Sequence, residues 1–244
     1  MTKLVFRDKI IKLDGVSLKN IGVSRSSKNV ASAISGLNGK AVLDIGCGVG
    51  YMTIGALLSG AKSVVAIDIC DTEKILRKNL RVNNIGQNRV VFYKSYLFER
   101  IPDDLKFDVI IANLPQHALP AKLESKKLEG KYGGYDGTDL VCRSLSEAFF
   151  YLNSGGRYFG SISELTNHRR TFLIADSLYD LKLKKTVVKK IKNDEMMPFL
   201  TEREFLDHLK KLKGAKMIDF SGDGVNFPIE YKVHYCQFNK KCVD

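Results

Sequence analysis

The sequence lacks any apolar run long enough to cross a membrane. No stretch of its 244 residues approaches the roughly 18 consecutive apolar residues that a membrane-spanning helix requires. The segment from Met1 to Lys12 is charged and alternating, without the apolar centre of a secretory signal peptide. We therefore expect a cytoplasmic protein with no membrane partner.

Cysteine is scarce and scattered. The five cysteines are odd in number, and no two have the Cys-x-x-Cys spacing that is typical of structural zinc sites. They are Cys47, Cys70, Cys142, Cys236 and Cys242. The four histidines are equally dispersed. We therefore expect free thiols in a reducing compartment, no disulfide framework and no metal.

Acidic residues are outnumbered, with 27 Asp and Glu against 39 Lys and Arg, which gives a formal net charge of +12. Such a balance is compatible with a nucleic acid or an acidic protein as partner, but ordinary surface solvation is the more common explanation. Lysine dominates the basic clusters, as in the run from Lys184 to Lys192, and lysine lacks the planar fork that arginine uses to read bases. Charge alone leaves the partner open.

From Ala41 onward, short apolar segments alternate with segments of helical periodicity. Alternating strands and helices are typical of an α/β fold, with a mostly parallel, doubly wound sheet covered by helices on both faces. The seven expected strands cover residues 41–45, 63–67, 90–93, 107–112, 157–162, 181–192 and 231–238. Ligands bind such sheets beyond the carboxyl ends of the strands, so the residues that follow the strands are the candidate site.

The domain organisation follows from the same pattern. Residues 1–40 are expected to form an N-terminal extension that packs on the core, with a strand from Val5 to Leu13 and a short helix capped by Ser26 or Ser27. Residues 41–244 are expected to form one domain, with an inserted helix near residues 201–213. A helix over Thr138–Leu152 is expected to end at Gly155-Gly156.

The most informative segment is the glycine-rich turn after the first strand of the alternation. Asp44 is followed by Gly46, Gly48 and Gly50, where glycines allow a tight turn and close approach of a ligand to the backbone. A nicotinamide or flavin fingerprint requires glycine at position 51, which is Tyr51, and the phosphate loop pattern is absent. The segment resembles motif I of class I methyltransferases, which implies a seven-stranded, Rossmann-like fold and S-adenosyl-L-methionine as cofactor.

Two further strand ends complete the cofactor site that this resemblance implies. Asp68 ends the second strand, where a carboxylate can accept hydrogen bonds from both ribose hydroxyls, and Ile69 is placed to pack on the adenine. Asp71 is expected to cap the following helix. Class I enzymes often carry an acidic residue after the third strand, whereas this chain has Tyr96 there, as an alternative contact to the adenine.

Asn113-Leu114-Pro115-Gln116 follows the fourth strand and resembles the Asn-Pro-Pro-Tyr motif of methyltransferases that act on planar nitrogens. The resemblance implies that Asn113 contacts both substrate and cofactor and orients an NH2 group, that Pro115 stiffens the loop, and that Gln116 helps to select the substrate. Two hydrogen-bond acceptors aimed at an NH2 group orient its nitrogen and favour the positive charge that develops there. Leu114 and Gln116 replace the usual proline and tyrosine.

A Gly-Gly-Tyr-Asp-Gly segment, residues 133–137, strengthens the similarity to release-factor glutamine methyltransferases. The resemblance covers roughly residues 43–156 and implies a protein or peptide side-chain amide as substrate. A nucleobase amine, a small metabolite and a non-catalytic role in cofactor binding are the alternatives. The first rests on the net charge, the second on the lost aromatic residue, and the third on the replacements at Tyr96 and Gln116.

Overall fold

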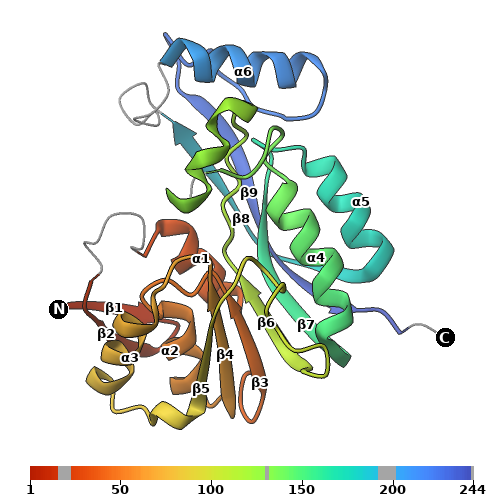
Figure 1. Ribbon diagram of the computed structural model, residues 1–244. Coiled ribbons are helices and arrows are strands. Elements are labelled where there is room, and N and C mark those ends of the chain that lie inside the picture. Colours follow the sequence, from red (N-terminus) through yellow and green to blue (C-terminus); the bar gives the residue numbers. More distant parts are fainter. Residues whose placement is uncertain (16–22, 130–131, 192–201, 243–244) are drawn as a thin grey trace.

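A seven-stranded sheet organises the chain (Figure 1). The computed structural model describes residues 1–15, 23–129, 132–191 and 202–242. The strands lie in the order β5-β4-β3-β6-β7-β9-β8, and β9 runs in the direction opposite to the other six. Their bounds are β3 Ala41–Ile45, β4 Ser63–Asp68, β5 Val90–Lys94, β6 Phe107–Ala112, β7 Leu152–Ser163, β8 Tyr179–Ile191 and β9 Ile229–Lys240. This confirms the expected mostly parallel, doubly wound sheet.

Two apolar clusters cover the two faces of the sheet. Side chains alternate along each strand, so that in β3 Val42 packs into one cluster while Leu43 and Ile45 pack into the other. The first cluster includes helices α1 (Arg25–Ala33), α2 (Tyr51–Leu58) and α3 (Glu73–Val82), and the second includes α4 (Asp139–Tyr151) and α5 (His168–Leu178). Among the described residues, no helix has the length and apolar character needed to span a bilayer.

The N-terminal segment is a hairpin where the sequence pattern indicated a single strand. β1 (Thr2–Phe6) pairs antiparallel with β2 (Lys9–Leu13), because the chain reverses at Arg7, which has a positive φ of 55°. The Phe6 side chain is fully buried and lies against Gly55 of α2, where any side chain would collide with its ring. The hairpin is therefore built into the core of the first face.

Two helix boundaries also differ from expectation. α1 begins earlier, with Ser24 as its N-cap, whose side chain accepts a hydrogen bond from the backbone N–H of Ser27. α4 ends at Tyr151 and passes directly into β7 at Leu152, so the Gly155-Gly156 pair lies inside the strand and does not end the helix. The ladder between β6 and β7 shifts register at this point, and Gly155 has a positive φ of 67° there.

A third apolar cluster forms a separate lobe beyond the carboxyl ends of the strands (Figure 1). It consists of α6 (Glu202–Gly214), the ends of β8 and β9 that carry this helix, and the loop after β6 with its short helix η2 (Ala121–Glu129). His208 of α6 lies on the ring of Tyr135, and its Nε2 lies 2.8 Å from the carbonyl oxygen of Tyr135. The lobe therefore contacts the loop that leads into the candidate site. Residue 201, the first residue of the expected inserted helix, lies outside the described residues.

Replacing Leu209 by alanine is expected to loosen this lobe selectively. Leu209 is fully buried in the third cluster, and its truncation is expected to cost about 2–5 kcal/mol of local stability. Hydrogen exchange should accelerate across α6 and around Leu119 while β3 and β4 remain protected. Lys210→Ala, at an exposed position of the same helix, is the control. Equal acceleration in β3 would contradict an independent lobe.

Candidate functional site

The candidate site lies where the strand order reverses. The chain builds β3, β4 and β5 in one direction and then crosses to β6 on the other side of β3, which opens a crevice between β3 and β6. Ile45 pairs with Ala112 in the parallel register, so Gly46 and Asn113 begin the loops after two neighbouring strands. β4 ends at Asp68 on the other side of β3. The fold thus brings these three sequence-predicted residues to one edge.

The turn after β3 requires its glycines. Gly46, Gly48 and Gly50 have φ angles of 74°, 51° and 91°, in the region that side chains disfavour. A Cβ atom at Gly50 would collide with Leu76 of α3, whereas one at Gly46 would meet no atom within 4 Å. The turn therefore packs against Leu76 of α3 at Gly50, whereas it borders open space at Gly46.

Asp68 holds this turn and the next one together. Its Oδ2 accepts a hydrogen bond from the backbone N–H of Gly48 at 2.9 Å, and its Oδ1 accepts one from Cys70 at 2.9 Å. Burial raises the pKa of Asp68, and these backbone hydrogen bonds oppose the rise. Each carboxylate oxygen keeps further acceptor capacity for a ligand hydroxyl. Asp71 is not the cap of α3, because Thr72 occupies that position without a side-chain hydrogen bond.

Asp44 lies beneath the turn and is almost fully buried, at 1% exposure. Its Oδ2 accepts a hydrogen bond from the hydroxyl of Thr53 at 2.6 Å. Burial raises the pKa of Asp44 to about 7, because the low-dielectric surroundings penalise the carboxylate more than the hydrogen bond stabilises it. The protonation state of Asp44 therefore changes near neutral pH.

Ile69 and Tyr96 stand at the far side of the crevice. Ile69 follows Asp68 and is half-buried. The strand end that carries Tyr96 is fixed to β4, because the backbone N–H of Ser95 donates to the carbonyl of Asp68 at 2.8 Å. The guanidinium of Arg143 on α4 lies 5.1 Å from the centre of the Tyr96 ring. Tyr96 is thus held between β5 and α4 at the edge of the crevice.

Asn113 is oriented by a residue that sequence reasoning considered only as a helix cap. Its Nδ2 donates to the hydroxyl oxygen of Ser27 at 3.0 Å, and that hydroxyl lies 3.0 Å from the hydroxyl of Ser24. Ser27 can donate its own hydrogen to Ser24 while accepting from Asn113, which fixes the direction of the amide. Because 86 residues separate Ser27 and Asn113, no local pattern reveals their contact.

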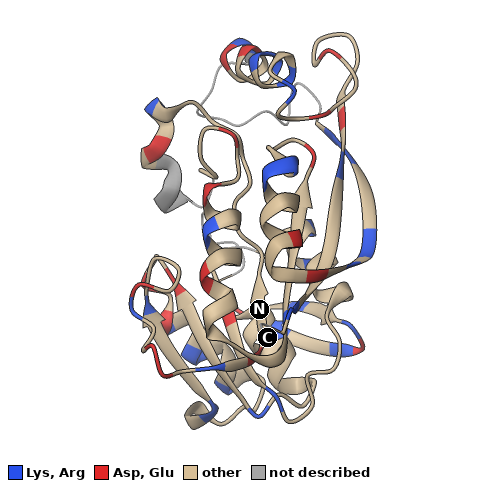
Figure 2. Cartoon of the chain, turned by 90° about the vertical axis from the view of Figure 1, so that its right-hand side faces the viewer, with Lys and Arg blue, Asp and Glu red and all other residues tan. Residues whose placement is uncertain are grey.

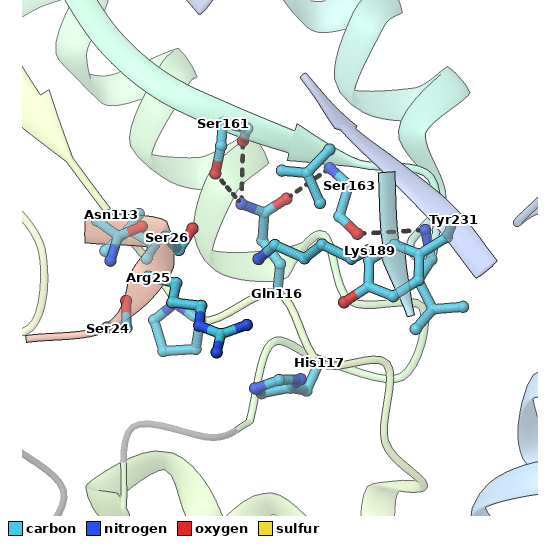
Figure 3. A pocket seen from close by; sticks show the side chains of 14 residues that line it. Ser24, Arg25, Ser26, Asn113, Gln116, His117, Ser161, Ser163, Lys189 and Tyr231 are labelled. Carbon is cyan, nitrogen blue, oxygen red and sulfur yellow. Dashed lines mark hydrogen bonds between the residues drawn. The ribbon is translucent and has the colours of Figure 1, made fainter. Parts of the chain in front are cut away.

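Gln116 lines the pocket, and its side-chain amide is bonded to β7 (Figure 3). Its Nε2 donates to the carbonyl oxygen of Ser161 at 3.0 Å and lies 2.9 Å from the Ser161 hydroxyl, while its Oε1 accepts from the backbone N–H of Ser163 at 3.0 Å. These bonds occupy both amide hydrogens. The geometry is that of a residue holding the loop of Asn113 and Pro115 against the sheet.

The Gly-Gly-Tyr-Asp-Gly segment packs directly behind this loop. The backbone N–H of Gly133 donates to the carbonyl of His117 at 3.0 Å, and a Cβ atom at Gly133 would press on the carbonyl oxygen of Pro115. Asp136 is buried and accepts hydrogen bonds from Thr138 and from Asn167 of the α5 N-cap. The segment therefore locks the Asn113 loop to the start of α4 and α5.

A pocket of about 320 Å³ opens beside Asn113 (Figure 3). Its walls come from the first turn of α1, the loop after β6, the end of β7 and the strands β8 and β9. The lining residues are Ser24, Arg25, Ser26, Asn113, Leu114, Pro115, Gln116, His117, Ser161, Ser163, Leu165, Lys189, Tyr231 and Val233. The pocket lies on the Asn113 side of the crevice, next to and distinct from the glycine turn.

Comparison with known proteins shows that this chain is similar to methyltransferases. The family model of ribosomal protein L11 methyltransferases matches residues 32–135. A protein of Methanocaldococcus jannaschii named "Putative protein N5-glutamine methyltransferase" is 32% identical over 172 residues, which cover 66% of this chain and 83% of the relative. The ribosomal protein L11 methyltransferase of Histophilus somni is 48% identical over 79 residues, only 25% of its length.

Solved structures show the same fold. The ribosomal protein L11 methylase of Lactobacillus delbrueckii subsp. bulgaricus matches with a TM-score of 0.52 at 18% identity. The match covers 89% of this chain and 79% of the methylase chain. The 16S rRNA N2 G1207 methyltransferase of T. thermophilus, in complex with AdoMet and guanosine, has a TM-score of 0.54 at 18% identity. That match covers 98% of this chain and 50% of the other.

The buried carboxyl of Asp44 predicts a pH-dependent stability. Its folded-state pKa of about 7 lies above its usual value of 3.8, so the stability it contributes is complete below pH 4 and is lost as the pH rises through 7. Asp44→Asn keeps an acceptor for Thr53 and removes the titration. The unfolding temperature of the wild type should fall relative to this variant by roughly 5–10 °C between pH 5 and pH 8.

Calorimetry of both proteins across this pH range measures the difference. Asp180→Asn, at an exposed position of β8, is the control and should follow the wild type. Parallel curves for the wild type and Asp44→Asn would contradict the raised pKa.

Proposed function

Since the chain belongs to the class I S-adenosylmethionine-dependent methyltransferases, we propose that it methylates a planar nitrogen, and that this nitrogen is a side-chain amide of a protein. The observation that carries the proposal is the place of Asn113, oriented by Ser27 at the mouth of a pocket and one strand away from the glycine turn. The name of the M. jannaschii relative supports a glutamine amide in particular.

The residues of the crevice fit the cofactor. S-adenosylmethionine supplies an electrophilic methyl group on a sulfonium sulfur. The open space at Gly46 leaves room for its methionine part against the turn of Gly46, Gly48 and Gly50. Asp68 retains acceptor capacity for the ribose hydroxyls, and Ile69 and Tyr96 flank the place of the adenine. Asp44 lies under the turn, where a cationic ligand favours its ionised form.

Asn113 supplies what a poor nucleophile needs. The lone pair of an amide nitrogen is delocalised, so the nitrogen must be held in line with the methyl carbon. Because the Nδ2 of Asn113 is committed to Ser27, its Oδ1 is the end available to accept a hydrogen bond from the substrate NH2 group. This bond would favour the positive charge that the nitrogen acquires with the methyl group, before an N–H proton passes to solvent.

The pocket favours an aliphatic amide over a nucleobase. Methyltransferases of the Asn-Pro-Pro-Tyr type stack a planar substrate on the aromatic residue of the motif, whereas here that position is Gln116, bonded to β7. A nucleobase without a stacking platform loses a contact worth about 1–3 kcal/mol per base. A glutamine amide is planar but much smaller than a base, so it loses less contact area when the platform is absent. Methylation of a nucleobase amine is therefore the second candidate, supported by the net charge of +12.

We place the reaction in the cytoplasm. No disulfide joins the cysteines of the described residues, and three of them, Cys47, Cys142 and Cys236, are buried. Cysteines that form no disulfide are usual in a reducing compartment.

Asn113→Ala is expected to separate catalysis from cofactor binding. The variant loses the acceptor at the pocket mouth while the glycine turn and Asp68 are unchanged. Turnover should therefore fall by about 10²-fold or more, with nearly unchanged affinity for S-adenosylmethionine by calorimetric titration. The assay is transfer of labelled methyl groups into the protein, RNA and small-molecule fractions of a host lysate.

Asn88→Ala, an exposed amide in the short helix η1 (Gln87–Arg89), is the matched control and should retain full activity. Label in the protein fraction, on an amide nitrogen, is the expected result. Label confined to the RNA fraction would show that the substrate is a nucleobase amine and not a protein amide. Normal turnover by Asn113→Ala would overturn the assignment of the site.

Ser27→Ala tests the orientation of Asn113 separately. The cap of α1 is kept, because alanine retains the backbone N–H that donates to the Ser24 side chain. Release of the Asn113 amide should lower kcat by about tenfold, the cost of one hydrogen bond, with little change in KM. Ser27→Thr restores the hydroxyl and should restore kcat. Ser32→Ala, exposed on the same helix, is the control, and an unchanged kcat in Ser27→Ala would exclude a positioning role.

A further inference from the structure

We infer that the pocket beside Asn113 recognises an anionic group next to the methylated amide, and that Arg25 and Lys189 are the residues that bind it. The inference rests on the proposed function and specifies its substrate. It is an amide whose neighbouring side chain or terminus carries a carboxylate.

The two cations reach the pocket from opposite walls (Figure 3). Arg25 is the first residue of α1, while Lys189 lies near the end of β8, and both side chains line the cavity that also contains Asn113. Neither forms an ion pair within the part of the chain that the structure describes. By contrast, the neighbouring Lys190 pairs with Glu230, and Lys185 donates to Asn29 at 3.0 Å.

The rest of the lining reinforces the positive potential. The described residues that line the pocket include no aspartate and no glutamate. The first turn of α1 opens into it, with the hydroxyls of Ser24 and Ser26 beside Arg25. Lys189 is half-buried, so its ammonium group works in surroundings less polar than bulk water. Arg25 is exposed and Lys189 is half-buried, so an anion that enters the pocket meets two positive partners at its rim and wall.

A carboxylate fits this place better than a nucleic-acid phosphate. Phosphate contacts bring the adjacent bases with them, and single-stranded bases bind by stacking on aromatic side chains. The rings that line the pocket are those of His117 and Tyr231, and the Tyr231 side chain packs against the apolar clusters of the first face and of the lobe. The volume of about 320 Å³ suits one amide side chain and a neighbouring carboxylate.

The surface around the pocket agrees with an acidic partner. β8 carries lysines along most of its length, at positions 182, 184, 185, 189 and 190, and Figure 2 shows basic residues along the long strands that lead to the lobe. Most of these side chains are exposed and stabilise an encounter with an acidic segment only weakly. The specific recognition belongs to Arg25 and Lys189.

The test begins with the native substrate. The protein fraction of a host lysate is labelled by the wild-type enzyme, and the methylated amide is located by mass spectrometry. We expect an aspartate, a glutamate or a chain terminus within two residues of it. Replacing that acid by its amide in the substrate should lower kcat/KM by about tenfold, and so should Arg25→Gln or Lys189→Gln in the enzyme.

Combining the substrate variant with the enzyme variants tests whether the acid and the two cations contact each other. If the acid and the cations contact each other, the losses are not additive, and Arg25→Gln should cost less than twofold on the neutralised substrate. Exchanging the acid for lysine should abolish methylation by the wild type and be partly rescued by Arg25→Glu. Lys62→Gln, at an exposed position just before β4 and outside the pocket, is the control and should leave kcat/KM unchanged.

The failures are distinguishable. A methylated amide without a neighbouring acid, or strictly additive losses, would overturn the anion inference while the proposed function stands. Label in the RNA fraction alone, sensitive to Arg25→Gln and Lys189→Gln, would assign the two cations to a phosphate and overturn both. Label in no fraction would reject the proposed function, and the inference falls with it.

Discussion

The parallel pairing of β3 with β6 is the constraint on which the site depends. The pairing places the end of β3 beside the end of β6. The glycine turn that follows β3 therefore lies next to Asn113, which follows β6. Both strands are almost entirely apolar and packed on both faces, so a shift of register would move every side chain to the wrong cluster. The distance between cofactor and substrate nitrogen is therefore determined by the same burial that stabilises the domain, and the loops themselves can vary.

The N-terminal segment belongs to the site as much as to the fold. Phe6 fastens the hairpin to α2, and the buried side chains of Val30 and Ile34 fasten α1 to the first face. With α1 fixed in this way, its first turn presents Ser27 to Asn113 and Arg25 to the pocket. A helix that precedes the cofactor-binding motifs in the chain thus completes the substrate side of the crevice. This arrangement links the stability of the first 40 residues to catalysis.

Much of this could be predicted from the sequence, because the strongest signals are local. Continuous apolar segments followed by glycine or aspartate identify β3 and β4 and their carboxyl ends, and the order of strands and helices then fixes the sheet. The errors have local causes as well. The reversal at Arg7 depends on a non-glycine residue with positive φ, which no turn pattern marks, and the Gly155-Gly156 pair permits a bulge as readily as it ends a helix.

The contacts that could not be predicted connect distant parts of the chain. Ser27 with Asn113, Gln116 with β7, and His208 with Tyr135 each join segments whose proximity follows only from the assembled sheet and lobe. Gln116 is the most instructive of them. As a sequence motif it reads as a polar substrate contact in place of tyrosine, whereas the structure uses its whole amide to hold the loop.

That substitution changes the physical basis on which a substrate is selected. An aromatic residue after Pro115 selects planar substrates through stacking, which depends on contact area and is insensitive to charge. Because that residue is a tether here, the proposed selectivity rests on the other lining residues, which include hydroxyls, two cations and the rings of His117 and Tyr231. Charge acts over a longer range than stacking and depends on ionic strength. With Arg25 and Lys189 as the proposed anion-binding pair, electrostatic recognition of the substrate would take the place of shape recognition.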